Sequence, residues 1–247
     1  MAVGKSRIRV VFGGFEGSYP PDQVRLRQGL VRACVSPQTE VDFDYLDAPI
    51  SMYGNGAASP EQLQQGADGF ARNAIKAERD GFDAVTLYGN ADVGLEEARR
   101  QVRIPVFGWG QISLHMASLL APRFGVIVYD EDEIPSSQER AERYGLTRHI
   151  VGFKSTGMPN AVMAERQQEL RERLVDRSKE LVSQGAQLIL PWGISMIPVN
   201  WTADALSEAI GVPVVDTMLV AMRTIEIIVD AGLTTRASEQ TMEVQLP

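Results

Sequence analysis

Eight short apolar runs recur along the chain, and helix-period segments separate each run from the next. The runs span residues 8–12, 41–46, 84–88, 105–107, 124–129, 150–153, 187–190 and 212–215. Most are rich in Val, Ile and Leu and lack the polar–apolar alternation of half-exposed strands, so they predict parallel sheets covered by helices. The longest helical segment is expected over residues 160–183. This alternation predicts an α/β fold, in which ligands bind at the carboxyl ends of the strands.

Composition narrows the range of functions. The 247 residues are 44% hydrophobic, enough for a substantial core, and their net charge of -8 argues against nucleic acid or an anionic membrane as a partner. No signal peptide or apolar run near the ~20 residues of a membrane span is seen, so we expect a cytoplasmic protein. One cysteine, Cys34, and two histidines, His115 and His149, leave little for a disulfide or a metal site. Without a dinucleotide fingerprint or a P-loop, no cofactor is expected.

Two parts of the chain follow the same plan. In "FDAVTLYGNADVG" with "RIPVFGWG", and again in "AQLILPWGISMIP" with "GVPVVDTM", a buried strand leads into a glycine-containing turn and later into a Pro-Val strand. This repeat aligns Gly89 with Gly193 and Pro105 with Pro213. It predicts two similar Rossmann-like or flavodoxin-like lobes related by pseudo-twofold symmetry, with the active site between them. The alternative is that α/β units look alike for physical reasons alone. The expected first lobe comprises residues 1–108 plus 218–247, and the second comprises residues 109–217.

A family resemblance rests on the segments around these glycines. The stretch "GNADVGLEEARRQVRIPVFGWGQISLHMASLLAPRFGVI", with "QGAQLILPWGISM" and "IGVPVVDTMLVAMRTIEIIVDAGL", resembles the hydantoin racemase branch of the aspartate/glutamate racemase superfamily. The family pattern has Cys and then Asp-Pro-Gly-Leu after one strand, and Leu-Gly-Cys-Ala-Gly-Met in the second half. The matching positions are Asp92, Gly94, Leu95, Met196 and His115. The resemblance implies a cofactor-independent isomerase of small molecules.

Both cysteine positions of the family hold glycine in this chain, at Gly89 and Gly193. In the family, two thiols flank the substrate's α-carbon, so that one removes the proton and the other delivers a proton to the opposite face. That two-thiol racemisation is not available here. Arylmalonate decarboxylase, a relative, is similar in having glycine at the first position but keeps a cysteine at the second.

Four side chains are candidates for proton transfer in place of the thiols. Glu16, the leading choice, follows the first strand in "GGFEGSYPP", where glycines let a carboxylate approach a ligand; otherwise it is a solvated turn residue. Asp92 acts as a base or holds its own turn. Tyr129 resembles a tyrosine of the decarboxylase relative that contacts carboxylate oxygens, or it caps the core. His115 is catalytic or a hydrogen-bonded core histidine, and Cys34 is expected to be a small buried hydrophobe.

Two loops are expected to bind the substrate through backbone N–H groups, with help from the dipoles of the helices that follow, in a way that suits a carboxylate or an enolate. The expected binding residues are Gly89, Asn90 and Ala91 in the first loop and Gly193, Ile194 and Ser195 in the second. Trp109, Trp192 and Tyr53, with Phe15 and Met52, either form a surface for a bulkier substrate than aspartate or are ordinary packing aromatics.

These features predict an isomerase that racemises, epimerises or shifts a double bond in a small carboxylate, imide or carbonyl compound through an enolate-like intermediate. Two alternatives stay open. One is a lyase, decarboxylase or hydrolase that uses the same loops, and the other is a non-enzymatic small-molecule-binding protein. A homo-oligomer is expected.

Overall fold

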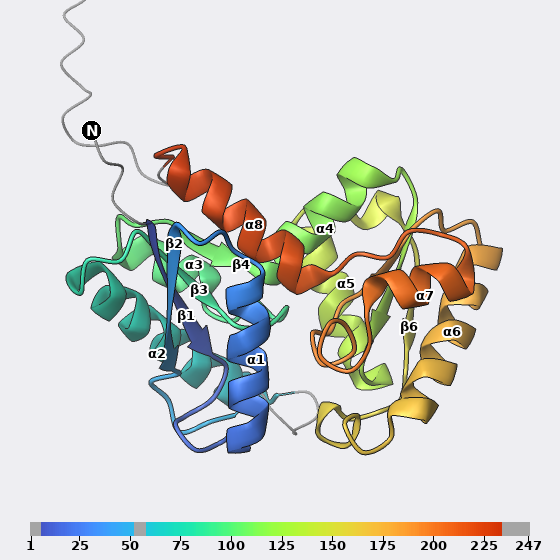
Figure 1. Ribbon diagram of the computed structural model, residues 1–247, viewed down its shortest axis with the longest axis horizontal. Coiled ribbons are helices and arrows are strands. Elements are labelled where there is room, and N and C mark those ends of the chain that lie inside the picture. The colour runs from blue at the N-terminus through green and yellow to red at the C-terminus, as the bar shows by residue number, and fades with distance from the viewer. Residues whose placement is uncertain (1–5, 52–57, 234–247) are drawn as a thin grey trace, which may run out of the picture.

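Two parallel sheets, one in each of two lobes, form the framework of the protein (Figure 1). The structure is a computed structural model that describes residues 6–51 and 58–233. The sheet orders are β2-β1-β3-β4 and β6-β5-β7. The strands are β1 (Ser6–Phe12), β2 (Thr39–Tyr45), β3 (Ala84–Leu87), β4 (Val106–Gly108), β5 (Phe124–Val128), β6 (Ile150–Ser155) and β7 (Ile189–Pro191). The predicted α/β fold with two parallel-sheet lobes is confirmed.

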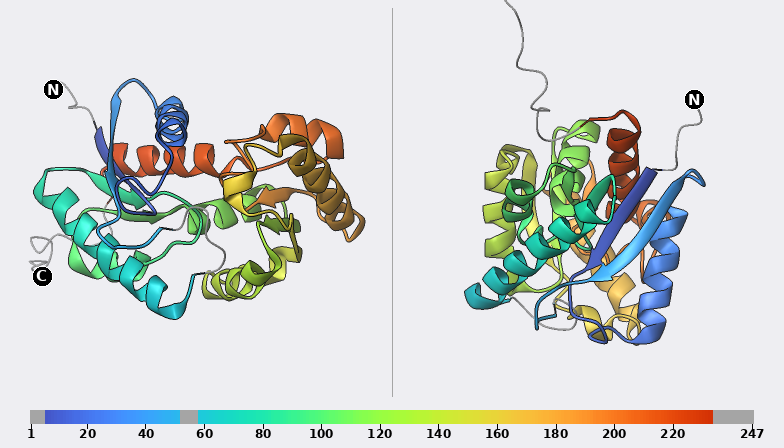
Figure 2. Two further views of the ribbon diagram at one scale, coloured as in Figure 1. Left: turned by 90° about the horizontal axis from the view of Figure 1, so that it is seen from below. Right: turned by 90° about the vertical axis from the view of Figure 1, so that its left-hand side faces the viewer.

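Helices cover both sheets (Figure 2). They are α1 (Pro21–Ala33), α2 (Pro60–Arg79), α3 (Leu95–Gln101), α4 (Trp109–Leu120), α5 (Ile134–Arg143), α6 (Gln167–Ser183), α7 (Ala203–Ile210) and α8 (Thr217–Asp230), with 3₁₀ turns η1 (Glu131–Glu133), η2 (Thr147–His149) and η3 (Asn160–Val162). The helix expected over residues 160–183 is divided into η3 and α6, because Arg166 leaves helical geometry at φ -118° and ψ 41°. None of the helices in the described ranges is long and apolar enough to cross a membrane.

The two sheets repeat one topology. The order β6-β5-β7 reproduces β2-β1-β3, and the place that β4 occupies in the first sheet is taken in the second by Val214, which forms a parallel bridge with Ile189. The strand predicted over residues 212–215 is therefore reduced to one bridge. Pro105 precedes β4 and Pro213 precedes Val214, as the sequence repeat requires. The equivalent glycines then follow equivalent strands, β3 and β7.

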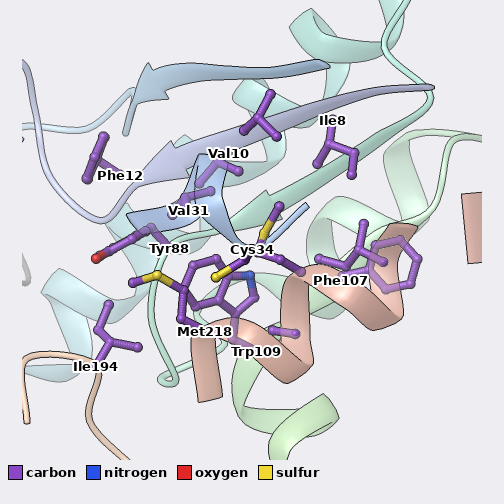
Figure 3. Packing of buried hydrophobic residues seen from close by; sticks show 14 of the residues in the cluster. Ile8, Val10, Phe12, Val31, Cys34, Tyr88, Phe107, Trp109, Ile194 and Met218 are labelled. Atoms are coloured by element: carbon purple, nitrogen blue, oxygen red, sulfur yellow. The ribbon is translucent and has the colours of Figure 1, made fainter. Parts of the chain in front are cut away.

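The core of the first lobe includes residues from the end of the chain. Ile8 and Val10 of β1 belong to one buried cluster with Met218 of α8 and with Trp109 (Figure 3). The helix α8 thus packs on the first sheet although it follows the second sheet in sequence. The division of the chain into residue ranges for the two lobes stays a prediction.

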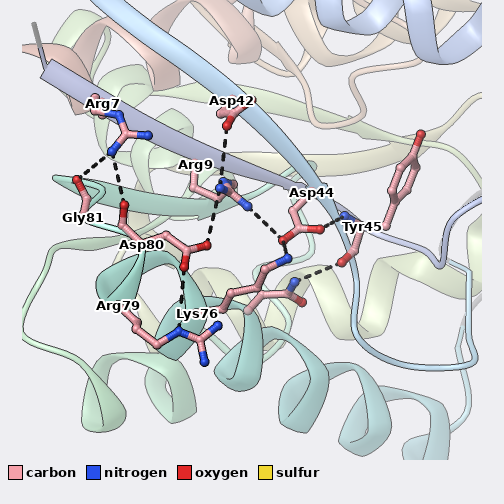
Figure 4. Close-up of polar contacts among 10 residues, drawn as sticks. Arg7, Arg9, Asp42, Asp44, Tyr45, Lys76, Arg79, Asp80 and Gly81 are labelled. Carbon is pink, nitrogen blue, oxygen red and sulfur yellow. Dashed lines mark hydrogen bonds and ion pairs between the residues drawn. The ribbon is translucent and has the colours of Figure 1, made fainter.

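The β1 residue between Ile8 and Val10 faces a charged cluster instead (Figure 4). Arg9 is 8% exposed, donates to Asp44 Oδ2 at 2.9 Å, and stacks 4.1 Å from the ring centroid of Phe82. Lys76 of α2 also contacts Asp44 Oδ2, at 2.7 Å. Burial alone would raise the pKa of Asp44, but the hydrogen bonds and charges of these cations lower it below its ordinary range. This cluster fastens α2 to β1 and β2 and takes no part in the cavity described next.

Candidate active site

A cavity of about 220 Å³ opens where the carboxyl ends of the strands meet between the lobes. Its lining comes from the segments that follow β1, β3, β5 and β7, from Arg27 of α1, and from residues at the start of α2 and in η3. Parallel strands place the loops after their carboxyl ends at one edge of the sheet, so two such sheets facing each other enclose a site between four loops. The two glycine loops, with Gly89 and Gly193, therefore face the same space.

The loop after β3 presents unsatisfied polar groups to this cavity. Asn90 is 8% exposed, and neither its Nδ2 nor its Oδ1 has a hydrogen-bond partner in the described parts of the chain. Within those same parts, no group accepts a hydrogen bond from the backbone N–H of Gly89, Asn90 or Ala91. A buried amide without partners costs ~1–3 kcal/mol, so a ligand that offers both an acceptor and a donor is its natural complement.

Asp92, next along this loop, fastens the loop to α4. Its carboxylate accepts hydrogen bonds from the backbone N–H of Gly110 (2.9 Å), the backbone N–H of Gln111 (2.7 Å) and the Tyr144 hydroxyl (2.8 Å). Its backbone is left-handed, with φ 51°. Burial raises the pKa of Asp92, although these three hydrogen bonds oppose the rise. Its geometry matches the structural alternative, a residue that holds its turn, extended here to the start of α4.

The second glycine loop is already occupied by Tyr129. A Cβ at Gly193 would lie 2.5 Å from Cζ and 2.6 Å from Cε1 of the tyrosine ring, whereas a Cβ at Gly89 would meet no atom of the described residues within 4 Å. The Tyr129 hydroxyl accepts a hydrogen bond from the Ser195 backbone N–H at 2.9 Å. Burial raises the pKa of Tyr129 to about 12. The phenol therefore stands as a neutral hydroxyl beside Gly193, in space that a side chain at that position would need.

Arg27 of α1 brings a positive charge into the cavity from the first lobe. It is 1% exposed and donates to Tyr88 Oη at 3.4 Å, to Gln23 Oε1 at 3.4 Å and, across the lobe boundary, to Ser195 Oγ at 3.2 Å. Burial alone would lower the pKa of Arg27, but Tyr88 raises it above its ordinary value. The sequence offered no sign of this role, because an arginine in an amphipathic helix is normally on the solvated face.

The turn η1 and one face of α5 form another part of the cavity wall. Glu133, Ser136 and Arg140 all contact the cavity, and Arg140 stacks 4.8 Å from the Trp192 ring centroid and donates to Ser137 Oγ at 2.9 Å. Burial raises the pKa of Glu133 to about 7. Sequence reasoning did not single out Glu133 or Arg140, although their spacing in "EIPSSQER" places both on one helical face.

Several predicted site residues lie elsewhere. Glu16 is exposed and outside the cavity lining. His115 is also exposed, with its ring centroid 6.5 Å from that of Tyr144, so it is not the core histidine of one alternative; it is also outside the cavity lining, where a catalytic histidine is expected. Trp109 is fully buried and packs against Tyr88 in the core of the first lobe, whereas Trp192 does line the cavity. Phe15 is 46% exposed. Tyr53 and Met52 lie outside the described residues.

The loops do not lead directly into helices. The helix α3 begins only at Leu95, and residues 194–200 form turns, so the expected help from helix dipoles at Asn90 and Ser195 is not present. Cys34 ends α1 at 8% exposure in the core of the first lobe (Figure 3), and burial raises its pKa to about 11. In the described ranges, no three His, Cys, Asp or Glu side chains cluster closely enough to hold a metal ion.

Known proteins share both the sequence pattern and the architecture. The family profile described as Asp/Glu/Hydantoin racemase matches residues 29–225. The hydantoin racemase of Rhizobium meliloti is 28% identical over 189 residues, which cover 73% of this chain and 77% of that protein. The allantoin racemase of Klebsiella pneumoniae superposes with a TM-score of 0.79 at 22% identity, covering 94% of this chain and 90% of its own. A double mutant of arylmalonate decarboxylase superposes with a TM-score of 0.63 at 17% identity, covering 92% of this chain and 94% of the decarboxylase chain.

Proposed function

The chain belongs to the Asp/Glu/hydantoin racemase family, and from that premise we propose that it is a cofactor-independent isomerase of small cyclic imides or ureides. The reaction is proton exchange at a carbon next to a carbonyl group, through an enolate-like intermediate. Hydantoin and allantoin, after which two of its relatives are named, both carry such a carbon in a five-membered ring of alternating N–H and C=O groups.

The unsatisfied Asn90 amide is the observation that carries this proposal. One edge of a cyclic imide offers an N–H donor beside a C=O acceptor, and a carboxamide offers the complementary acceptor and donor. Asn90 is buried, lines the cavity and has both groups without partners among the described residues. The neighbouring backbone N–H groups of Gly89 and Ala91 add donors where an enolate oxygen would develop charge.

The position of the single cysteine supports a mechanism without thiols. Cys34 is packed into the core of the first lobe, does not line the cavity, and has a raised pKa that disfavours the thiolate. At the two glycine positions, Gly89 leaves open space and Gly193 is filled by the neutral phenol of Tyr129. Proton transfer therefore falls to oxygen acids and bases of the cavity wall.

Deuterium exchange tests the proposal directly. The protein is incubated in deuterium oxide with single enantiomers of benzylhydantoin and allantoin, and with phenylmalonate, and followed by proton NMR and chiral chromatography. An isomerase exchanges the proton on the ring carbon and forms the other enantiomer faster than buffer alone. Loss of carbon dioxide from phenylmalonate would instead indicate a lyase. Thermal stabilisation without exchange or turnover would indicate a binding protein, and either result would overturn the proposal.

A further inference from the structure

The part of the cavity wall formed by η1 and α5 contains an acidic residue, Glu133, that is not among the four predicted proton-transfer residues. Resting on the proposed isomerase function, we propose that Glu133 is the catalytic base that removes the proton from the substrate's ring carbon. It stands in the 3₁₀ turn η1 at the start of α5, where it lines the cavity and is only partly exposed.

The other acids of this region are unsuited to that role. Glu131 accepts a hydrogen bond from Ser155 Oγ at 2.6 Å on the β6 side. Glu139 is exposed and pairs with Arg143 at 3.2 Å. Asp132 touches the cavity but is exposed, so it stays hydrated. Glu133 combines contact with the cavity and partial burial, so it can reach a bound ligand and is shielded in part from water.

The surroundings of Glu133 match the chemistry. Burial raises its pKa to about 7; the charge of Asp130 acts in the same direction, while the Tyr129 backbone N–H and the charge of Arg140 oppose the rise. A base is most effective when its pKa lies near the working pH, because it is then both deprotonated and basic enough to accept a proton. The guanidinium of Arg140, on the same face of α5, keeps the carboxylate form accessible.

The earlier candidates fit less well. Glu16 does not reach the cavity lining. The carboxylate of Asp92 already accepts three hydrogen bonds from α4 and Tyr144. Tyr129 lines the cavity, but with its pKa raised to about 12 it is a proton donor rather than a base near neutrality. This leaves the carboxylate of Glu133, in η1, which lines the same cavity as the amide of Asn90.

The proton balance of the step is simple. The C–H bond breaks, its proton bonds to a carboxylate oxygen of Glu133, and the electron pair moves into the carbonyl group to give an enolate. The N–H groups near Asn90 hold the enolate oxygen. Return of a proton from the Glu133 carboxyl, after exchange with solvent, restores the original configuration with isotope exchange. Inversion requires a proton on the opposite face, which a water molecule supplies; the hydroxide left behind takes the proton of the Glu133 carboxyl, so that water and the carboxylate are both regenerated.

The variant Glu133→Gln tests the role of this carboxylate, with Glu142→Gln as the matched control. Both residues lie in the same η1–α5 region, but Glu142 is exposed and outside the cavity. Exchange of benzylhydantoin in deuterium oxide should fall about a hundredfold or more in Glu133→Gln. The melting temperature and the benzylhydantoin dissociation constant should stay near wild type. In Glu142→Gln, the exchange rate should also be unchanged.

A pH profile provides a second readout that does not depend on how well the glutamine variant folds. In the wild type, the exchange rate should rise with pH through a midpoint near 7, since the base works only when deprotonated. Glu133→Asp should keep that rising limb at a reduced rate. If the wild type exchanges the ring proton but Glu133→Gln stays within threefold of it, or the rising limb is missing, Glu133 is not the base while the proposed function survives. If the wild type exchanges neither benzylhydantoin nor allantoin, the proposed function itself fails, and this inference with it.

Discussion

At the residue scale, two glycines at equivalent places in the repeat lie in opposite surroundings. Gly89 adopts φ 120° beside open space, whereas Gly193 packs against the Tyr129 ring. A side chain at Gly89 is therefore disfavoured by its backbone, and one at Gly193 by its neighbour. Introducing cysteines at both positions would therefore strain both loops.

This contrast predicts that removing the Tyr129 ring relieves the destabilisation caused by a side chain at position 193 but not at position 89. Gly193→Ala should cost ~1–3 kcal/mol in the free energy of unfolding through overpacking, and adding Tyr129→Ala should remove most of that increment. Gly89→Ala should cost ~1–3 kcal/mol through backbone strain, and Tyr129→Ala should not relieve it. Urea denaturation of the single and double variants measures both couplings. If the interaction free energy of Tyr129→Ala with Gly193→Ala equalled that with Gly89→Ala, the packing of Tyr129 against Gly193 would be contradicted.

The Asn90 amide predicts a trade-off between stability and function. Asn90→Leu removes two unsatisfied polar groups, so the free protein should become more stable by ~1 kcal/mol. The same variant should bind and turn over benzylhydantoin at least tenfold less well, because the ligand loses its partner. Calorimetric melting and titration on one preparation test both halves. A variant that is destabilised yet fully active would show that Asn90 serves the fold rather than the ligand.

At the element scale, α4 is fixed to the cavity loop through Asp92. Asp92→Ala leaves the backbone N–H groups of Gly110 and Gln111 without their acceptor, so we expect a loss of ~2 kcal/mol in the free energy of unfolding. Tyr144→Phe removes one of the three hydrogen bonds and should cost less. Urea denaturation gives the comparison. In Asp92→Ala, any fall in the rate of deuterium exchange should follow from displacement of the Asn90 loop and should therefore accompany the loss of stability. A variant that lost turnover while keeping wild-type stability would instead indicate a chemical role for Asp92.

Glu226 joins α8 to the α1–β2 connection and to the first residue of β2. Burial would raise the pKa of Glu226, but hydrogen bonds from Thr39 Oγ1 (2.6 Å), the Ser36 backbone N–H (2.7 Å) and Arg223 (2.9 Å) lower it to about 2. Its contribution to stability is therefore present above its ordinary pKa near 4.5 and is lost as the pH falls through about 2.

From this pH dependence we predict that Glu226→Gln is less stable than wild type by about 2 kcal/mol at neutral pH, and that the difference closes as the pH approaches 2. Denaturation at a series of pH values measures the gap. Glu208→Gln, at an exposed position on α7, is the control and should show no such gap. A constant difference across the acid range would mean that the ionised carboxylate is not what fastens α8.

At the scale of the whole molecule, the architecture followed from local sequence patterns, whereas much of the site did not. Apolar runs and the Gly89–Gly193 repeat indicated two parallel sheets, because a strand buried on both faces needs apolar residues at consecutive positions. Arg27 and Glu133 were missed, since their place in the cavity depends on how two lobes pack together. Glu16 was misplaced because the backbone bond from Phe15 N–H to the Ile50 carbonyl (3.2 Å), which no local pattern shows, holds its loop with the side chain exposed.

The same distinction applies to assembly. The chain's likeness to its relatives fixes the family and the fold, but a homo-oligomer and the residue ranges of the lobes stay predictions. A homo-oligomer depends on contacts between the surfaces of separate chains, and the residue ranges depend on where one lobe ends and the other begins. The packing of individual strands determines neither.

The most direct measurement of thiol-free isomerisation uses a protein without any cysteine. Cys34→Ser removes the one thiol of the chain from the core of the first lobe, away from the cavity. Deuterium incorporation into single-enantiomer benzylhydantoin and its inversion should proceed within about twofold of the wild-type rate, because proton transfer rests on the oxygen groups of the cavity. Loss of both exchange and inversion in a Cys34→Ser protein that still melts cooperatively would show that the chemistry depends on that thiol, and would contradict the mechanism proposed.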